Sequence, residues 1–393
     1  EQIAAFSTAQ IAAIESQDIR GLTRQQVTAL RSDQVGGFTS DQVTSFNATQ
    51  LAALETEDLI ALSTDNIVAL TTGQMAAFTN AQISNLTTDQ IVALETEDLG
   101  MLKGTQIVAL ESDQFAAMTT DQIQSLKPSQ IATIESQDLN ALSTDQIQSL
   151  TSDQLPALTT YQFKNLATDS LVAFTTDQLA AFTGNHMRVL TTDQMQAFTT
   201  DQMPGFETRD LVVLTATQLN ATTTDQIDAL TTGQVASLTN AQIASLGQDQ
   251  VGALNTNQIV ALGQRQVQSL TALQISAMST TQVAALETSD LASMATQQIV
   301  AFGPEQISAM TTQQIAGMRR AQISALTNEQ LGALDTTQIV AIEAFDIVGL
   351  TSRQINALNS EQVQALTTEQ VAAFSPTQIA SMSVENIGVF TTD

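Results

Sequence analysis

The chain has 393 residues, no cysteine and a formal net charge of -28 at pH 7. Without cysteine it forms neither disulfides nor thiolate metal sites. The acidic balance predicts no nucleic-acid partner, and no segment approaches the roughly 18 consecutive apolar residues of a membrane-spanning helix, so no membrane insertion is expected.

The dominant feature is an eight-residue phrase, typified by TTDQIVAL at Thr87 to Leu94, which occurs forty-eight times without insertion or deletion from Ser7 to Phe390. A fixed period of this kind indicates a repeat architecture, in which each unit buries its apolar face against its neighbours. Numbering the octad 1 to 8, position 5 is always a large apolar residue, and position 8 is apolar everywhere except at Thr222. Positions three apart share one face of a helix, so the pattern favours helices over strands.

Positions 1 and 4 indicate where each helix begins. Position 1 is Ser or Thr in 27 octads and position 4 is Gln in 37, which reproduces a capping box again and again along the chain. Pro128, Pro304 and Pro376 stand at position 2, the first helical position, where a missing N–H costs nothing. Pro156 and Pro204 stand at position 6, so those two octads are expected to be kinked or 3₁₀-like.

The resulting prediction is an all-α fold, an elongated α-solenoid of about 48 short capped helices, one per eight-residue repeat. Isolated helices this short are marginal in water, so stacking must stabilise them. No linker or change of composition divides the chain, and we expect residues 1–393 to form a single continuous octapeptide-repeat solenoid. Because the sequence starts and stops within an octad, we expect it to be a segment of a longer array.

Two periods longer than the octad are open to interpretation. Glu15, Glu55, Glu95 and Glu135 recur at intervals of 40, which indicates a five-octad duplication unit that need not equal one turn of the solenoid. Two octads per coil would make a stack of helical hairpins, with 24 coils and a length of about 200 Å. Three octads per coil would make a triangular solenoid, and the sequence does not choose between them.

Seven octads replace the position-4 Gln by Asp, and all seven have Glu at position 1. Two acids three residues apart on one helical turn repel each other at neutral pH. One hypothesis is that calcium offsets the repulsion, because hard cations bind carboxylate oxygens. The densest candidates are Glu55, Glu57, Asp58, Glu95, Glu97 and Asp98. The other hypothesis is an alternative cap, with Asp accepting backbone N–H groups and Glu turned to solvent.

The single histidine, His186, stands at position 4 in place of Gln. With no second His, no Cys, and the Ser and Thr residues used as caps, no catalytic triad can be assembled around it. We interpret His186 as a substitute for Gln in the cap. The sequence therefore predicts that the chain is not an enzyme and has no cofactor other than the calcium considered above.

Over its whole length the array resembles the octapeptide-repeat regions, of Thr/Ser-x-x-Gln type, in very long bacterial secreted or surface proteins of fibre or adhesin type. The resemblance implies an extracellular structural protein at a bacterial surface. The first functional hypothesis is a stalk or self-assembling filament, at the cell surface or in a biofilm matrix, that associates end to end with other copies. The alternative is a solenoid adhesin, a binding module for a protein or polysaccharide ligand.

Overall fold

The computed structural model describes residues 2–390, and the chain divides into two compact units, with unit 1 ending at Phe198 and unit 2 beginning at Thr199. Each unit contains 24 octads, from Ser7 to Phe198 and from Thr199 to Phe390, because 192 residues divided by eight is 24. Every regular element among the described residues is a helix. The expectation of one continuous solenoid through both units stays a prediction.

The regular elements of unit 1 are short α-helices with two 3₁₀-helices, labelled η. In chain order they are η1 Ile3–Ala5, α1 Thr8–Ala12, α2 Ser16–Ile19, α3 Arg24–Thr28, α4 Ser32–Val35, α5 Ser40–Val43, α6 Ala48–Leu51, α7 Thr56–Leu59, α8 Thr64–Ala69, α9 Thr72–Met75, α10 Asn80–Ser84, α11 Thr88–Ala93, α12 Thr96–Met101, α13 Gly104–Ile107, α14 Ser112–Ala117, α15 Thr120–Ser125, α16 Pro128–Ile131, α17 Ser136–Leu139, α18 Thr144–Ser149, η2 Leu155–Ala157, α19 Thr160–Lys164, α20 Thr168–Val172, α21 Thr176–Leu179, α22 Gly184–Val189 and α23 Thr192–Ala197.

Unit 2 repeats the same kind of element. Its helices are η3 Met203–Gly205, α24 Thr208–Leu211, α25 Ala216–Ala221, α26 Thr224–Asp228, α27 Thr232–Ser237, α28 Asn240–Ser245, α29 Gln248–Ala253, α30 Thr256–Ala261, α31 Gln264–Ser269, α32 Ala272–Ala277, α33 Thr280–Ala285, α34 Thr288–Ser293, α35 Thr296–Val300, α36 Pro304–Ser308, α37 Thr312–Ala316, α38 Arg320–Ala325, α39 Asn328–Gly332, α40 Thr336–Ala341, α41 Ala344–Ile347, α42 Ser352–Ile355, α43 Ser360–Gln364, α44 Thr368–Ala373, α45 Pro376–Ala380 and α46 Val384–Gly388.

The prediction of one short helix per octad is confirmed. The 46 α-helices of residues 2–390 account for all but two of the forty-eight octads, and η2 and η3 occupy those two. These are the octads with Pro156 and Pro204, so the expectation of 3₁₀-like geometry at position-6 prolines is also confirmed. Proline at this point removes a backbone N–H donor from the last helical turn. The chain closes that turn with hydrogen bonds between residues three apart in the sequence, as in a 3₁₀-helix.

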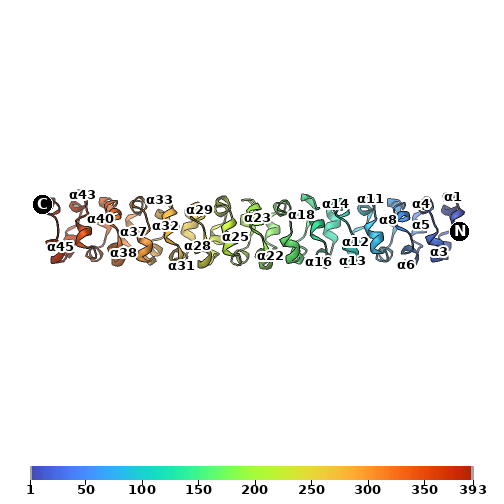
Figure 1. Cartoon of the computed structure of the whole chain (residues 1–393), viewed down its shortest axis with the longest axis horizontal. Helices are drawn as coiled ribbons and strands as arrows, with labels where there is room; N and C mark the ends of the chain where they lie inside the picture. The colour runs from blue at the N-terminus through green and yellow to red at the C-terminus, as the bar shows by residue number, and fades with distance from the viewer. Residues whose placement is uncertain (1, 391–393) are drawn as a thin grey trace. The chain divides into compact units, whose positions relative to one another are not determined.

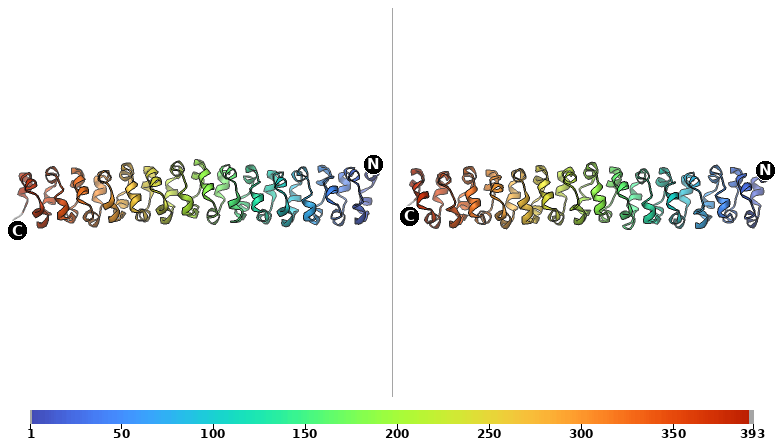
Figure 2. Two further views of the ribbon diagram at one scale, coloured as in Figure 1. Left: turned by 90° about the horizontal axis from the view of Figure 1, so that it is seen from below. Right: turned by 60° about the horizontal axis from the view of Figure 1, so that its bottom comes forward.

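Each coil of the solenoid consists of three octads. In unit 2, α27 packs against α30, α28 against α31 and α29 against α32, and in unit 1 α11 packs against α14 in the same way. One coil therefore takes 24 residues, and the 24 octads of each unit make eight coils. Figures 1 and 2 show the helices of each unit following one another as successive coils. The two-octad alternative is excluded, along with the length calculated from it.

Positions 5 and 8 line the interior of the coils. Ile91 at position 5 is fully buried and Leu94 at position 8 is 4 % exposed, and these values are typical of both positions. Burying such a side chain stabilises the fold by roughly 1.5 to 3 kcal/mol. The exceptional Thr222 is also buried, where its hydroxyl donates to the carbonyl of Leu219 at 2.6 Å and accepts from Nε2 of Gln250 at 3.0 Å.

Candidate functional site

The position-4 glutamine is the most regular polar feature of the structure, and its first role is in its own octad. Oε1 of Gln122 accepts the backbone N–H of Thr119 at 2.9 Å, and Oγ1 of Thr119 accepts the N–H of Gln122 at 3.2 Å. This is the reciprocal capping box that the sequence predicts. The glutamine side chain is nevertheless 2 % exposed, so its amide nitrogen must also find partners.

Those partners lie in the previous coil. Nε2 of Gln122 donates to the carbonyls of Ile91 and Leu94, both at 2.8 Å, which are 31 and 28 residues earlier. In unit 2, Nε2 of Gln282 makes the same pair of hydrogen bonds at 2.8 and 2.6 Å. We call this contact, from position 4 to the position-5 and position-8 carbonyls four octads earlier, a joint. Each joint connects the start of one helix to the end of a helix in the previous coil.

Where the glutamine is missing, an asparagine of the previous coil can replace it. Ser170 stands at position 4 of its octad, and Oδ1 of Asn140 accepts both the Ala167 N–H at 2.8 Å and the Ser170 hydroxyl at 3.2 Å. In unit 2, Oδ1 of Asn356 accepts the N–H of Ser383 at 2.7 Å, in an octad that has Asn at position 4. Sequence reasoning missed this substitution, although an Asn 27 residues before the altered octad is a usable signal.

His186 takes over both functions of glutamine in its joint. Nδ1 accepts the N–H of Thr183 at 3.3 Å, and Nε2 lies 2.8 Å from the carbonyl of Leu158. The neutral ring protonated on Nε2 satisfies both partners. The ring stacks on Phe163 with centroids 4.6 Å apart, and burial lowers the pKa of His186. The interpretation of His186 as a substitute for Gln in the cap is confirmed.

The calcium candidates divide between the interior and the surface. Asp58 and Asp98 are 6 % and 2 % exposed, whereas Glu55, Glu57, Glu95 and Glu97 are exposed. No group of three His, Cys, Asp or Glu side chains within residues 2–390 is arranged to hold a metal ion. Calcium binding at these six residues stays a prediction.

The glutamates of these octads face solvent, as the alternative-cap hypothesis expects. The Glu55 and Glu95 side chains make no hydrogen bond to their helix starts. Asp58 accepts the hydroxyl of Ser32 at 2.8 Å, while Oδ2 of Asp98 is buried and has no hydrogen-bond partner. Burial raises the pKa of Asp98 to about 6, and the Glu95 and Glu97 carboxylates raise it as well.

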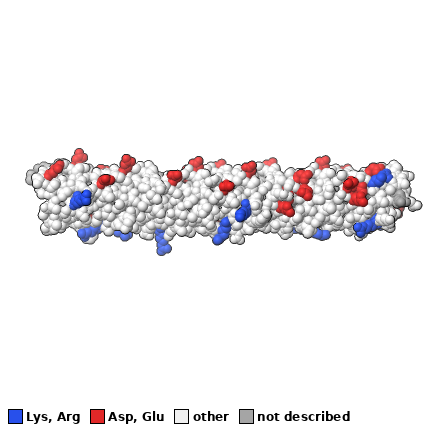
Figure 3. Space-filling model, in the orientation of Figure 1, with Lys and Arg blue, Asp and Glu red and all other residues white. Residues whose placement is uncertain are grey.

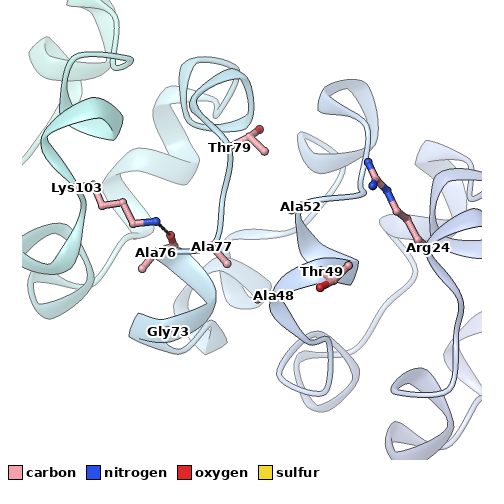
Figure 4. Close-up of a pocket in the computed structure, with 9 residues that line it drawn as sticks. All are labelled: Arg24, Ala48, Thr49, Ala52, Gly73, Ala76, Ala77, Thr79 and Lys103. Carbon is pink, nitrogen blue, oxygen red and sulfur yellow. Dashed lines mark hydrogen bonds between the residues drawn. The ribbon is translucent and has the colours of Figure 1, made fainter.

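A shallow groove of about 610 Å³ lies on the surface of unit 1 (Figure 4). Its lining includes Ala48, Ala52, Gly73 and other small side chains, and the basic residues Arg24 and Lys103 stand at its two ends. Nζ of Lys103 donates to the carbonyl of Ala76 at 3.1 Å. The groove thus combines a small-residue floor with two cations on a protein that is acidic overall.

Most of the side chains on the face drawn in Figure 3 are uncharged. On the face drawn in Figure 3, acidic and basic side chains of each unit lie singly or in small groups among neutral residues. None of the helices in the described part of the chain has the length and apolar character that crossing a lipid bilayer requires.

Short capped helices, three-octad coils and a joint at most octads define an α-helical tandem-repeat solenoid. The chain belongs to the ALTTAQ repeat family, whose model matches residues 11–48, 51–88, 91–128, 131–168, 171–206, 203–240, 283–320 and 339–376. The family phrase is visible at Ala69 to Gln74, which reads ALTTGQ and spans the end of one octad and the cap of the next. No curated protein matches the chain.

The family repeat and the structural coil have different lengths. The first five family matches begin 40 residues apart, at residues 11, 51, 91, 131 and 171, while one coil takes 24 residues. A feature that recurs once per family repeat therefore moves by five octads, or one and two-thirds coils, and comes to the same side only after 120 residues. The Glu/Asp octads at Asp58, Asp98 and Asp138 accordingly lie on three different sides of unit 1.

Proposed function

We propose that the chain is an extracellular structural protein, forming a stalk or a self-assembling filament at a bacterial surface or in a matrix. The observation that supports this proposal is the joint. In most octads the position-4 Gln is buried and its amide donates to carbonyls of the previous coil, as Gln122 and Gln282 illustrate, so it binds one coil to the next and is not available to a ligand. Such a protein gains length by adding octads, because each coil contacts only its neighbours.

Two further observations agree with a structural role. In unit 1, the 24-residue coil and the 40-residue spacing of the family matches distribute recurring side chains over all three sides, which suits an object with no single working face. The commonest coil-to-coil contact, made by the position-4 Gln, also recurs in both units, so it is chemically suited to join one copy to another. A contact of this head-to-tail kind generates open filaments rather than closed rings.

The experiment is negative-stain electron microscopy of the purified chain over a range of concentrations, with calcium or with a chelator. Separate, extended rods of uniform length would support the stalk, and filaments much longer than one chain would support self-assembly. Compact, non-extended particles under every condition would overturn both. Location is tested separately, with antibodies on intact source cells: labelling before permeabilisation is expected, and labelling only after permeabilisation would contradict a surface position.

A second function, binding of a surface polysaccharide or protein, is favoured by the groove of unit 1. Arg24 and Lys103 at its ends would attract an acidic ligand, and the small residues between them would admit an extended chain. An acidic glycan or peptide that binds the wild type should bind the Arg24→Gln, Lys103→Gln double variant at least tenfold more weakly. A double variant with Arg319→Gln and Arg320→Gln, which removes the same charge from unit 2, is the matched control. Equal loss in both would reduce the effect to net charge.

A further inference from the structure

The buried aspartates occupy the place of the joint glutamine, but their chemistry is opposite. Six of the seven position-4 aspartates have 7 % exposure or less, namely Asp58, Asp98, Asp138, Asp210, Asp290 and Asp346. A glutamine presents an N–H₂ donor to the coil below, whereas an ionised carboxylate has acceptors only. An Asp octad that is ionised therefore has no donor to offer at its joint.

The register identifies what faces Asp98. Gln90 and Gln106, in the octads on either side, donate to the carbonyls 31 and 28 residues earlier, at 2.9 to 3.3 Å. The same register places the carbonyls of Ile67 and Leu70 opposite Asp98. Asn66 shows that a side chain as short as Asp can span the joint, because its Nδ2 reaches the carbonyl of Phe38 at 3.2 Å. Acceptor thus faces acceptor at the Asp98 joint, in agreement with the unpartnered Oδ2.

The charges around Asp98 make its ionised form still less favourable. On its own helix, α12, the charged groups are Glu95 and Glu97. Of the helices packed against α12 within the described chain, α9 carries no titratable side chain and α15 carries only the exposed Asp121. The charged groups on these three helices are all acids, whereas the cation Lys127, which follows α15, contacts α12 at Met101, with Nζ 3.8 Å from Sδ.

We propose that the Asp98 octad contains a proton-operated joint, closed when the Asp98 carboxyl is protonated and opened when it is ionised. In the protonated state the Asp98 O–H donates to a carbonyl of the coil below, as the Asn66 amide does. On deprotonation the proton passes to bulk water, and the carboxylate and the carbonyl repel each other. The proposal does not depend on the structural function proposed above.

The direction of the pH effect follows from linkage. Because the pKa of Asp98 is raised in the folded chain to about 6, the folded state binds more protons than the unfolded state at mildly acidic pH. The stability of the joint is therefore fully present below the unfolded pKa and is lost as the pH rises through about 6.

The test is hydrogen exchange with mass spectrometry on the full chain at pH 5 and pH 7.5, in chelator and corrected for intrinsic exchange. Peptides covering residues 95–102 should be about tenfold better protected at pH 5 than at pH 7.5. Peptides covering the Gln122 joint, residues 119–126, report any change that net charge causes generally. In the Asp98→Asn variant, which imitates the protonated state, protection of residues 95–102 should be high at both pH values.

A matched variant, Gln90→Asn, shortens a joint side chain without adding a titratable group, and its protection should not depend on pH. The proposal is overturned if residues 95–102 of the wild type are equally protected at both pH values, or if Asp98→Asn keeps the wild-type dependence. Adding calcium at pH 7.5 provides another arm. Protection restored by calcium in the wild type, but not in Asp98→Asn, would replace the proton by a cation and would also overturn it.

Discussion

Helices α11 and α12 of unit 1 are adjacent in the chain and have the same length, yet their joints differ. In α11, Oε1 of Gln90 accepts the N–H of Thr87 at 3.0 Å, and Nε2 donates to the carbonyl of Leu62 at 2.9 Å. In α12, neither the capping box nor a partner for Oδ2 of Asp98 is formed. The position-5 and position-8 side chains are equally buried in both helices.

This comparison separates two contributions to the fold. Apolar burial is the same in the two octads, so it suffices to keep the α12 helix in its place in the coil. The polar joint is therefore an additional contribution, which the chain can weaken locally without losing a helix. A hydrogen bond contributes about 1 kcal/mol net, whereas a buried aliphatic side chain contributes roughly 1.5 to 3 kcal/mol, so apolar burial is expected to be the larger of the two contributions.

The largest effect is expected from converting the α11 joint toward the α12 type with a longer acid. Gln90→Glu keeps the shape of the side chain but places a buried carboxylate against the Leu59 and Leu62 carbonyls, which lose their donor. We expect a cost of about 4 kcal/mol at pH 7.5. Hydrogen exchange of residues 87–94, with chemical denaturation of the full chain, measures it. Gln124→Glu makes the same change at an exposed position, and an equal loss there would mean that the joint is not responsible.

A smaller effect is expected at the joint that uses asparagine. Asn140→Ala removes the acceptor of the Ala167 N–H and a donor at 3.0 Å to the carbonyl of Asn165, at a cost of about 1.5 kcal/mol. Adding Ser170→Gln to this variant restores the consensus joint and should recover most of the loss. Protection of residues 167–172 is the readout. A double variant no better than Asn140→Ala alone would show that the two solutions are not equivalent.

Much of this arrangement was predictable from the sequence. The spacing of positions 5 and 8 predicted the core, and the Thr-x-x-Gln pattern predicted the capping box that Thr119 and Gln122 form. The prolines of η2 and η3 predicted where α-helix gives way to 3₁₀ geometry. These features depend on residues within one octad, where local geometry decides the outcome.

The joint could not be predicted, because it connects residues 28 and 31 apart and so depends on the number of octads per coil. Both two and three octads per coil satisfy the apolar pattern, and only the three-octad register brings Gln122 to the carbonyls of Ile91 and Leu94. The sequence also did not indicate that the Asp58 and Asp98 side chains point inward while Glu55 and Glu95 point outward, because this too depends on how the coils pack. The replacement of the missing glutamine of the Ser170 octad by Asn140 likewise could not be predicted without the number of octads per coil.

His186 offers a joint whose pH dependence has the opposite sign to that of Asp98. Burial lowers the pKa of His186, so the unfolded state binds the proton more readily, and stability is lost as the pH falls through the folded pKa. The loss is at most about 1.4 kcal/mol per pH unit in that window. Protection of residues 183–190 should therefore fall on acidification while that of residues 95–102 rises. His186→Gln should abolish the first change only, and a loss of both would point to a common cause such as net charge.

The smallest effect on stability is expected from the exposed position-6 side chains, which take no part in the joints. Val68 and Val92 are both at position 6, with 44 % and 46 % exposure, on the packed helices α8 and α11, so they lie on one side of consecutive coils. At a concentration where the protein is monomeric, Val92→Thr should change the free energy of unfolding by less than about 0.5 kcal/mol, because an exposed valine buries little apolar surface on folding. The measurement is repeated at increasing protein concentration. An effect that appears only at high concentration would mean that another copy covers this side, which would make lateral packing, rather than end-to-end contact alone, part of the assembly.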